Sequence, residues 1–265
     1  PDYRERVGAA LATAMGCVYR YDLAWYARYI DRLYLPSARM GAHVPGFPED
    51  RMAPLPPGCE IVDEAPSSRA DGGLHLLYIG GLGGHYRLQE CLRAVVDVPG
   101  ASLTICTRPD QSAGDQYAAM VEAAGGRIDV VHRSGEELTA LYERADACVL
   151  FVEPDPYREF ASPVKLYEYL GRGKPVIASQ GTLAAEVVGV ADAGWTLPYD
   201  ASELAGLLRR LLEQPHEIAQ AAHRAQGARE EHTWLSRARV VADDMQAVRA
   251  GELPRARTLR AGGTR

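Results

Sequence analysis

The 265-residue sequence lacks the patterns that mark several large classes of protein. Its five cysteines contain no C-x-x-C pair, which argues against structural zinc and a disulfide framework and favours reduced thiols in the cytoplasm. No apolar run approaches the ~20 residues of a membrane span, although peripheral contact at the inner face of a membrane stays open. The formal net charge of −6 gives no overall basic footprint, so no nucleic-acid partner is expected.

Signatures of metal-dependent and hydrolytic enzymes are also missing. The sequence has no H-E-x-x-H motif, no cysteine cluster and no D-x-D between apolar residues at a strand end, so no metal site is expected. The absence of a G-x-S-x-G elbow and of a Walker A motif disfavours an α/β-hydrolase and a P-loop ATPase. What remains is an ordinary globular composition, with 47% apolar and 24% charged residues.

Short apolar runs alternate with helical patterns from residue 74 onward. Strands are predicted at 74–79, 101–106, 127–132, 146–152 and 174–178, and mainly helices from there to about 249. Ser134 and Glu137 have the spacing of a capping box at the start of one intervening helix. Strands separated by helices indicate an α/β fold with a Rossmann-like, doubly wound parallel sheet, in which ligands bind beyond the carboxyl ends of the strands.

The first 73 residues have a different character. Apolar residues at Leu23, Tyr26, Ile30 and Leu33 predict a helix, followed by irregular structure. Residues 45–73 are rich in proline and glycine and are interpreted as a linker. The expected organisation is therefore a partial, mostly helical segment over 1–73, the α/β domain over 74–232, and a final helix with a frayed tail over 233–265.

The stretch 159–177 gives the strongest indication of chemistry. Ser162 is expected to cap a helix that begins at Pro163, which places Lys165 in the first turn. A cation at this end of a helix costs about 0.3–1 kcal/mol, and a bound anion would reverse the effect. Free N–H groups, the dipole and Lys165 together predict a phosphate site, and Glu168 on the same face could accept hydrogen bonds from a ribose diol. The alternative is an ordinary surface pair between Lys165 and Glu168.

Segments after the first, third and fourth predicted strands carry further candidate ligand-binding residues. The glycine-rich segment after the first strand allows close backbone approach, but it fails the G-x-G-x-x-G pattern at Tyr86, and a flexible turn is the alternative. Charged residues after the third and fourth strands, including Arg158, face either a ligand or solvent. The candidates from these segments are Gly81, Gly83, Gly84, His85, Arg87, His132, Arg133 and Glu159.

The pattern Ser-Pro-x-Lys-Leu-x-Glu-Tyr-Leu-x-x-Gly-x-Pro-Val at 162–176 resembles the signature of family 4 retaining glycosyltransferases with the GT-B fold. Two earlier segments occur in the same order as in that family: the glycine loop at 79–84, and then Glu-Leu-x-x-Leu-Tyr-x-x-Ala-Asp at 137–146. The resemblance covers about 74–249 and implies the C-terminal, donor-binding half of that fold. It also implies that 1–73 is a remnant of the acceptor-side domain, so a missing N-terminal domain or a partner chain is expected.

Two departures from the family pattern affect the expected site. The family often carries two glutamates with seven residues between them, and counting back from Glu168 gives Phe160, with Glu159 one place away. The family's arginine and lysine after the first strand align with Gly81 and Tyr86. His85, Arg87 and Lys165 are the possible substitutes for binding the diphosphate.

The resemblance implies transfer of a hexosyl group from a nucleotide-sugar donor to a glycan, a lipid-linked or a small-molecule acceptor, in carbohydrate biosynthesis, without a metal or resident cofactor. Lys165 and Glu159 are then the candidate catalytic residues, Glu168 holds the ribose, and His132 and Arg133 flank the base. The phosphates are assigned to Gly83, Gly84, Lys165 and the helix start at Ser162 and Pro163. Alternatives are a donor-binding half that needs a partner chain, a nucleotide-sugar epimerase or phosphorylase, and, more distantly, a dinucleotide oxidoreductase. The isolated chain is expected to bind donor weakly and to transfer little.

Overall fold

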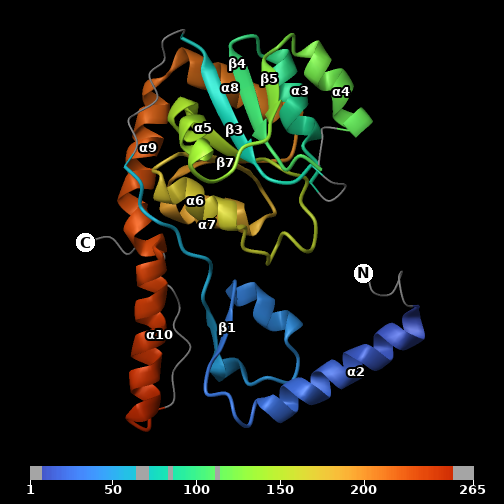
Figure 1. Cartoon of the computed structure of the whole chain (residues 1–265), viewed down its shortest axis with the longest axis vertical. Helices are drawn as coiled ribbons and strands as arrows, with labels where there is room; N and C mark the ends of the chain where they lie inside the picture. The colour runs from blue at the N-terminus through green and yellow to red at the C-terminus, as the bar shows by residue number, and fades with distance from the viewer. Residues whose placement is uncertain (1–7, 64–71, 83–85, 111–113, 253–265) are drawn as a thin grey trace. The chain divides into compact units, whose positions relative to one another are not determined.

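The computed structural model describes residues 8–63, 72–82, 86–110 and 114–252, which divide into two compact units (Figure 1). The larger unit comprises the described residues between 57 and 236, and the smaller one comprises 8–56 and 237–252.

The larger unit is built on one parallel sheet with the strand order β5-β4-β3-β6-β7-β8. This is the order of a Rossmann-like, doubly wound sheet, with β3 as its first strand. The predicted fold class is confirmed. The strands are β3 (Leu74–Ile79), β4 (Ala101–Cys106), β5 (Ile128–Val131), β6 (Ala147–Leu150), β7 (Val176–Ser179) and β8 (Gly194–Leu197).

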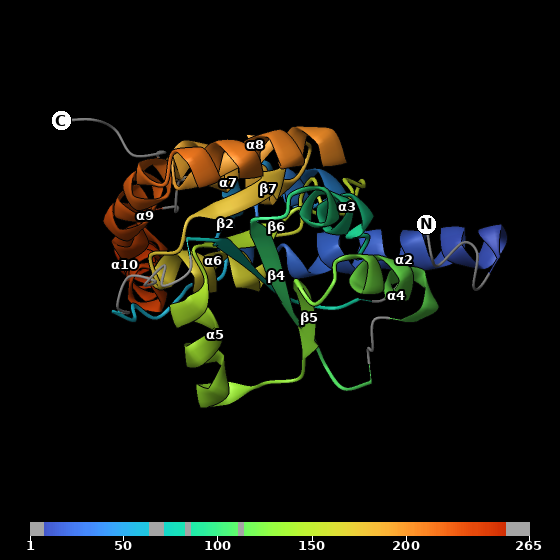
Figure 2. The same ribbon diagram turned by 90° about the horizontal axis from the view of Figure 1, so that it is seen from above.

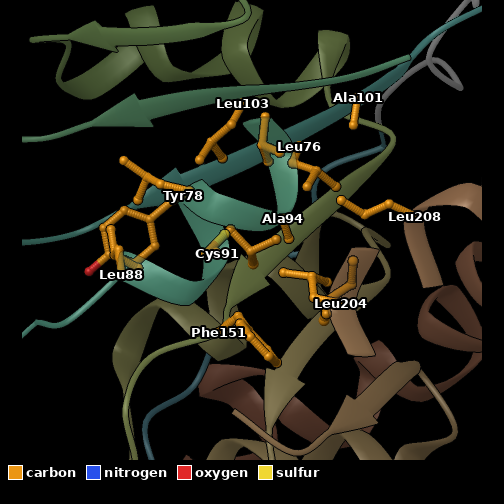
Figure 3. Close-up of a cluster of buried hydrophobic side chains, with 14 of the residues drawn as sticks. Leu76, Tyr78, Leu88, Cys91, Ala94, Ala101, Leu103, Phe151, Leu204 and Leu208 are labelled. Carbon is orange, nitrogen blue, oxygen red and sulfur yellow. The ribbon is translucent and has the colours of Figure 1, made fainter. Parts of the chain in front are cut away.

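Helices cover both faces of this sheet, as Figure 2 shows for α3 and α8 on one side and α5 on the other. Leu76 and Tyr78 point into the cluster formed with α3 and α8 (Figure 3). Leu77 and Ile79 pack on the other face with α5, α6 and α7. Both faces of β3 are therefore buried, which explains its nearly continuous apolar sequence. The helices of this unit are α3 (Gln89–Asp97), α4 (Gly114–Ala123), α5 (Leu138–Arg144), α6 (Val164–Gly171), α7 (Leu183–Ala191), α8 (Ala201–Glu213) and α9 (His216–Ala228). A further helix, α10 (Trp234–Arg249), belongs to the smaller unit from Arg237 onward.

The capping box predicted before α5 is present. Ser134 and Glu137 cap a 3₁₀ turn, Gly135–Glu137, that leads into the helix. The prediction of mainly helices after residue 178 named no strand there and so missed β8, which pairs with β7 as a sixth strand. Its four residues are half-buried, so they lack the continuous apolar run by which the other strands were identified.

The smaller unit contains α2 (Ala9–Tyr26) and a short parallel pair, β1 (Leu33–Leu35) with β2 (Met52–Pro54). The predicted helix through Leu33 is wrong beyond Tyr26, because Arg51 Nη1 donates hydrogen bonds to the carbonyl groups of Ala27 and Ile30 and holds that segment in a turn. The assignment of 1–73 to an acceptor-side remnant stays a prediction. No described helix combines the length and the apolar character that crossing a bilayer requires.

The five cysteines differ sharply in their environment. Cys17 lies exposed on α2, whereas Cys59, Cys91, Cys106 and Cys148 are buried. Burial raises the pKa of the Cys91 thiol to about 12, so it carries almost no reactive thiolate at pH 8. We expect Ellman's reagent to modify one thiol rapidly in the folded chain at pH 8 and all five in denaturant. Rapid reaction of two or more thiols without denaturant would contradict the packing described.

Candidate functional site

A cavity of about 540 Å³ lies at the carboxyl end of the sheet. Its walls come from the segments that follow β3, β4 and β5, with Leu138 of α5 and Lys165 of α6. β3 pairs with β4 on one side and β6 on the other, so the cavity adjoins the point where the strand order reverses. Ligands of open α/β sheets bind at this position.

Helix α6 begins at Val164, one residue later than the sequence predicts. Pro163 is the residue before its first turn and no side chain caps it. The predicted cap by Ser162 is wrong, because the Ser162 hydroxyl lies 2.8 Å from that of the buried Tyr167. The start of the helix therefore keeps backbone N–H groups without a side-chain acceptor, beside Lys165.

Lys165 and Glu168 form an ion pair one turn apart, with about a third of each side chain exposed. Lys165 lines the larger cavity, whereas Glu168 lines a neighbouring cavity of about 250 Å³ and lies 3.5 Å from the Tyr142 hydroxyl. Leu138 lines both cavities. The ion pair thus stands where the two cavities adjoin.

The glycine segment, residues 80–84, begins directly after β3, and its first two residues line the cavity. The packing of Tyr78 against Gly80 in this segment leaves no room for a larger residue. The buried Tyr78 hydroxyl donates a 2.9 Å hydrogen bond to the carbonyl of Gly81, and a Cβ atom on Gly80 would come within 2.5 Å of that hydroxyl. Burial raises the pKa of Tyr78 far above its ordinary value, so the hydroxyl stays a donor. Gly81 and Tyr86 line the cavity, and the predicted residues Gly83, Gly84 and His85 lie outside the described residues.

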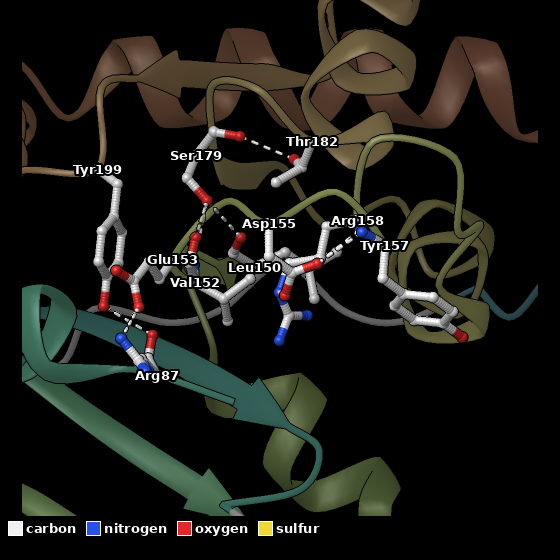
Figure 4. A network of polar contacts seen from close by, with 10 residues as sticks. All are labelled: Arg87, Leu150, Val152, Glu153, Asp155, Tyr157, Arg158, Ser179, Thr182 and Tyr199. Carbon is white, nitrogen blue, oxygen red and sulfur yellow. Dashed lines mark hydrogen bonds and ion pairs between the residues drawn. The ribbon is translucent and has the colours of Figure 1, made fainter. Parts of the chain in front are cut away.

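Arg87 is joined to the loop after β6 and does not line either cavity. Its guanidinium pairs with Glu153 at 2.6 Å, and its carbonyl accepts a 2.7 Å hydrogen bond from the Tyr199 hydroxyl (Figure 4). The predicted residue Glu159 is exposed on the same loop and likewise lines neither cavity.

His132 and Arg133 both line the cavity, as the prediction for the third strand end requires. His132 Nδ1 lies 3.0 Å from the Thr107 carbonyl oxygen, which joins the segments after β4 and β5. The sequence analysis expects ligands beyond the carboxyl ends of the strands but names no residue after β4. The structure adds Thr107 and Arg108 to the cavity wall; both directly follow the strand, which was the available signal.

In the part of the chain that the structure describes, no three histidine, cysteine, aspartate or glutamate side chains gather as a metal site would require. The described residues that line the cavity include Arg108, Arg133 and Lys165 and no carboxylate, which suits an anionic organic ligand.

Comparisons of the sequence and of the fold with known proteins both identify similarity to glycosyltransferases. The profile of the family described as glycosyl transferases group 1 matches residues 73–214, more than half of the chain. A mannosyltransferase of Mycolicibacterium hassiacum, described as MMP alpha-(1->4)-mannosyltransferase, is 37% identical over 100 residues, which is 35% of this chain and 23% of that protein.

Solved glycosyltransferase structures have the same fold. Sucrose-phosphate synthase from Thermosynechococcus elongatus matches with a TM-score of 0.67 and 19% identity, over 85% of this chain and 61% of that one. HepE from Anabaena, solved with UDP, matches with a TM-score of 0.69 and 14% identity, over 85% of this chain and 66% of that one. The chain thus spans less than two thirds of the length of these proteins.

Proposed function

Because the chain belongs to the group 1 glycosyl transferases, we propose that its 540 Å³ cavity binds the nucleoside diphosphate of a nucleotide-sugar donor. The observation that carries the proposal is Lys165, which lines this cavity in the first turn of a helix without a side-chain cap. We further propose that the reaction is a hexosyl transfer with retention, as the resemblance of 162–176 to family 4 implies.

The relatives support a hexose donor. HepE is solved with UDP and with UDP-glucose, and the curated relative is a mannosyltransferase. We extend this chemistry to the present chain as a proposal, with a glycan, lipid-linked or small-molecule acceptor. No metal or cofactor is part of the proposal, and the setting is the cytoplasm or the inner face of a membrane.

The proposed chemistry is stabilisation of a leaving diphosphate. When the glycosidic bond to the sugar breaks, negative charge develops on the diphosphate oxygen that leaves. Lys165 and the N–H groups at the start of α6 supply positive charge at a fixed position. Preorganised donors of this kind lower the barrier because they need not reorient as the charge forms.

Glu168 would hold the ribose beside the diphosphate. In the structure its carboxylate pairs with Lys165, next to the Tyr142 hydroxyl. A phosphate that attracts the Lys165 ammonium would leave this carboxylate to accept hydrogen bonds from the two ribose hydroxyls. His132 and Arg133 would then flank the base. Glu159 stays a candidate catalytic residue in this proposal, although its exposed side chain lines neither cavity.

A donor-binding half that works with a further domain or a partner chain is the second candidate. It is favoured by the coverage of the solved relatives, of which this chain spans 61% and 66%. We expect the 265-residue chain to bind donor weakly and to transfer little by itself. Appreciable glycosyl transfer by this chain alone would contradict that expectation.

Calorimetric titration with UDP, GDP and ADP tests the proposed function. At least one of them should bind, and Glu168→Ala should weaken the binding by about 1.5–3 kcal/mol, because a charged acceptor of hydrogen bonds is lost. The matched control is Glu213→Ala at the exposed end of α8, which should leave the affinity unchanged. If Glu168→Ala binds as tightly as the unaltered chain, Glu168 does not hold the ribose.

A further inference from the structure

The glycine segment lacks the cations that the resembled family carries after the first strand of this domain. Gly81 and Tyr86 stand at the aligned positions, and both line the cavity. The structure places another cation beside Tyr86, although this cation does not itself line the cavity. The Arg158 guanidinium, from the loop between β6 and α6, lies over the Tyr86 ring at 5.2 Å from its centroid.

The loop that carries Arg158 is held in place by Asp155. One carboxylate oxygen accepts hydrogen bonds from the backbone N–H groups of Tyr157 and Arg158, at 2.8 and 3.0 Å. The other oxygen lies 3.1 Å from Arg158 Nε (Figure 4). Backbone and side chain are therefore fixed together, and little conformational entropy remains to be lost when a ligand binds.

The charge of Arg158 acts close to the glycine segment. Its side chain is only 14% exposed, so solvent screens it weakly. It opposes the effect of burial on the pKa of Tyr78, the residue whose hydroxyl holds the Gly81 carbonyl. A guanidinium has five N–H donors in a planar fork, the geometry that matches two oxygens of a phosphate.

We propose that Arg158 is a diphosphate-binding residue of the donor site and replaces, from a different loop, the cations missing after β3. This inference rests on the proposed function and adds a residue that the family motif does not supply. Lys165 from α6 and Arg158 from the preceding loop then bind the same diphosphate. Tyr86, whose ring the guanidinium covers, serves to orient Arg158.

The test compares ligands that differ only in phosphate number. UDP, UMP and uridine are titrated into the 265-residue chain and into Arg158→Gln and Arg158→Lys, with NMR detection; if GDP binds more tightly, the guanosine series is used. Arg158→Gln should weaken diphosphate binding about 10- to 100-fold and change nucleoside binding less than twofold. The diphosphate affinity of Arg158→Lys should lie between those of the unaltered chain and Arg158→Gln, because lysine keeps the positive charge but lacks the planar fork of donors.

Arg93→Gln is the matched control, since Arg93 forms an exposed ion pair with Glu90 on α3 and should have no effect on binding. An unchanged diphosphate affinity in Arg158→Gln, or an equal loss for diphosphate and nucleoside, overturns the inference, because the second result is that of a structural role. Either outcome leaves the proposed function intact as long as the unaltered chain binds. If the unaltered chain binds none of UDP, GDP and ADP, the proposed function and this inference both fail.

Discussion

Replacing Gly194 with alanine is expected to lower the free energy of unfolding by about 3–5 kcal/mol, the range of a severe backbone disruption. Gly194 opens β8 with φ of 151°, opposite Val176 in the register of β7 and β8. A Cβ atom at this position would lie 2.0 Å from the Val176 carbonyl oxygen. The backbone of two paired strands must separate to admit it, and neither strand can move without disturbing the core.

Chemical denaturation of the variant beside Gly206→Ala checks this prediction. Gly206 lies inside α8, and a Cβ atom there would meet nothing within 4 Å. The free energy of unfolding of this control should rise by about 0.5–1 kcal/mol, because alanine is more favourable than glycine in the interior of a helix. Equal stability of the two variants would mean that β8 does not pair with β7 as described.

Lys165→Glu is expected to reduce nucleoside diphosphate affinity at least about 100-fold while leaving the fold intact. The substitution removes the proposed charge-assisted hydrogen bond to phosphate, for which about 1.5–3 kcal/mol is expected, and adds repulsion of the same anion. We expect a small effect on folding. An acidic side chain in the first turn stabilises α6 by about 0.3–1 kcal/mol, and this gain offsets the repulsion between the new carboxylate and Glu168. Binding and stability therefore separate in this variant.

Arg239→Glu on α10 changes the net charge by the same amount at an exposed position in the smaller unit. Titrating both variants with UDP and GDP, and measuring their thermal unfolding, separates a local contact from a general charge effect. Equal weakening in both variants would argue against a phosphate contact at Lys165. Loss of folding in Lys165→Glu alone would show that its pair with Glu168 is mainly structural.

The fold was largely predictable from the sequence because the central strands are buried on both faces. Leu74–Ile79 and Ala101–Cys106 are mainly apolar runs, and the structure confirms both strands at the predicted bounds. β8 was missed because Gly194–Leu197 is short and half-buried, which leaves no apolar run to detect. In the smaller unit, helical spacing through Leu33 was misleading, because pairing with β2 makes that residue part of a strand.

The candidate site was predictable only where one local motif determines it. The motif at 162–176 placed Lys165 at a helix start, and the strand end placed His132 and Arg133 at the cavity. Contacts between distant segments could not be read in this way. The pairing of Arg87 with Glu153 and the position of Arg158 over Tyr86 depend on how separate loops meet after folding.

A crystal structure of the chain with a bound nucleoside diphosphate tests the central claim most directly. The account predicts a diphosphate at the start of α6, within hydrogen-bond distance of the Lys165 ammonium, and a ribose beside Glu168. A nucleotide bound away from the 540 Å³ cavity would contradict it. So would a nucleotide inside that cavity with the Lys165 ammonium turned away from its phosphates.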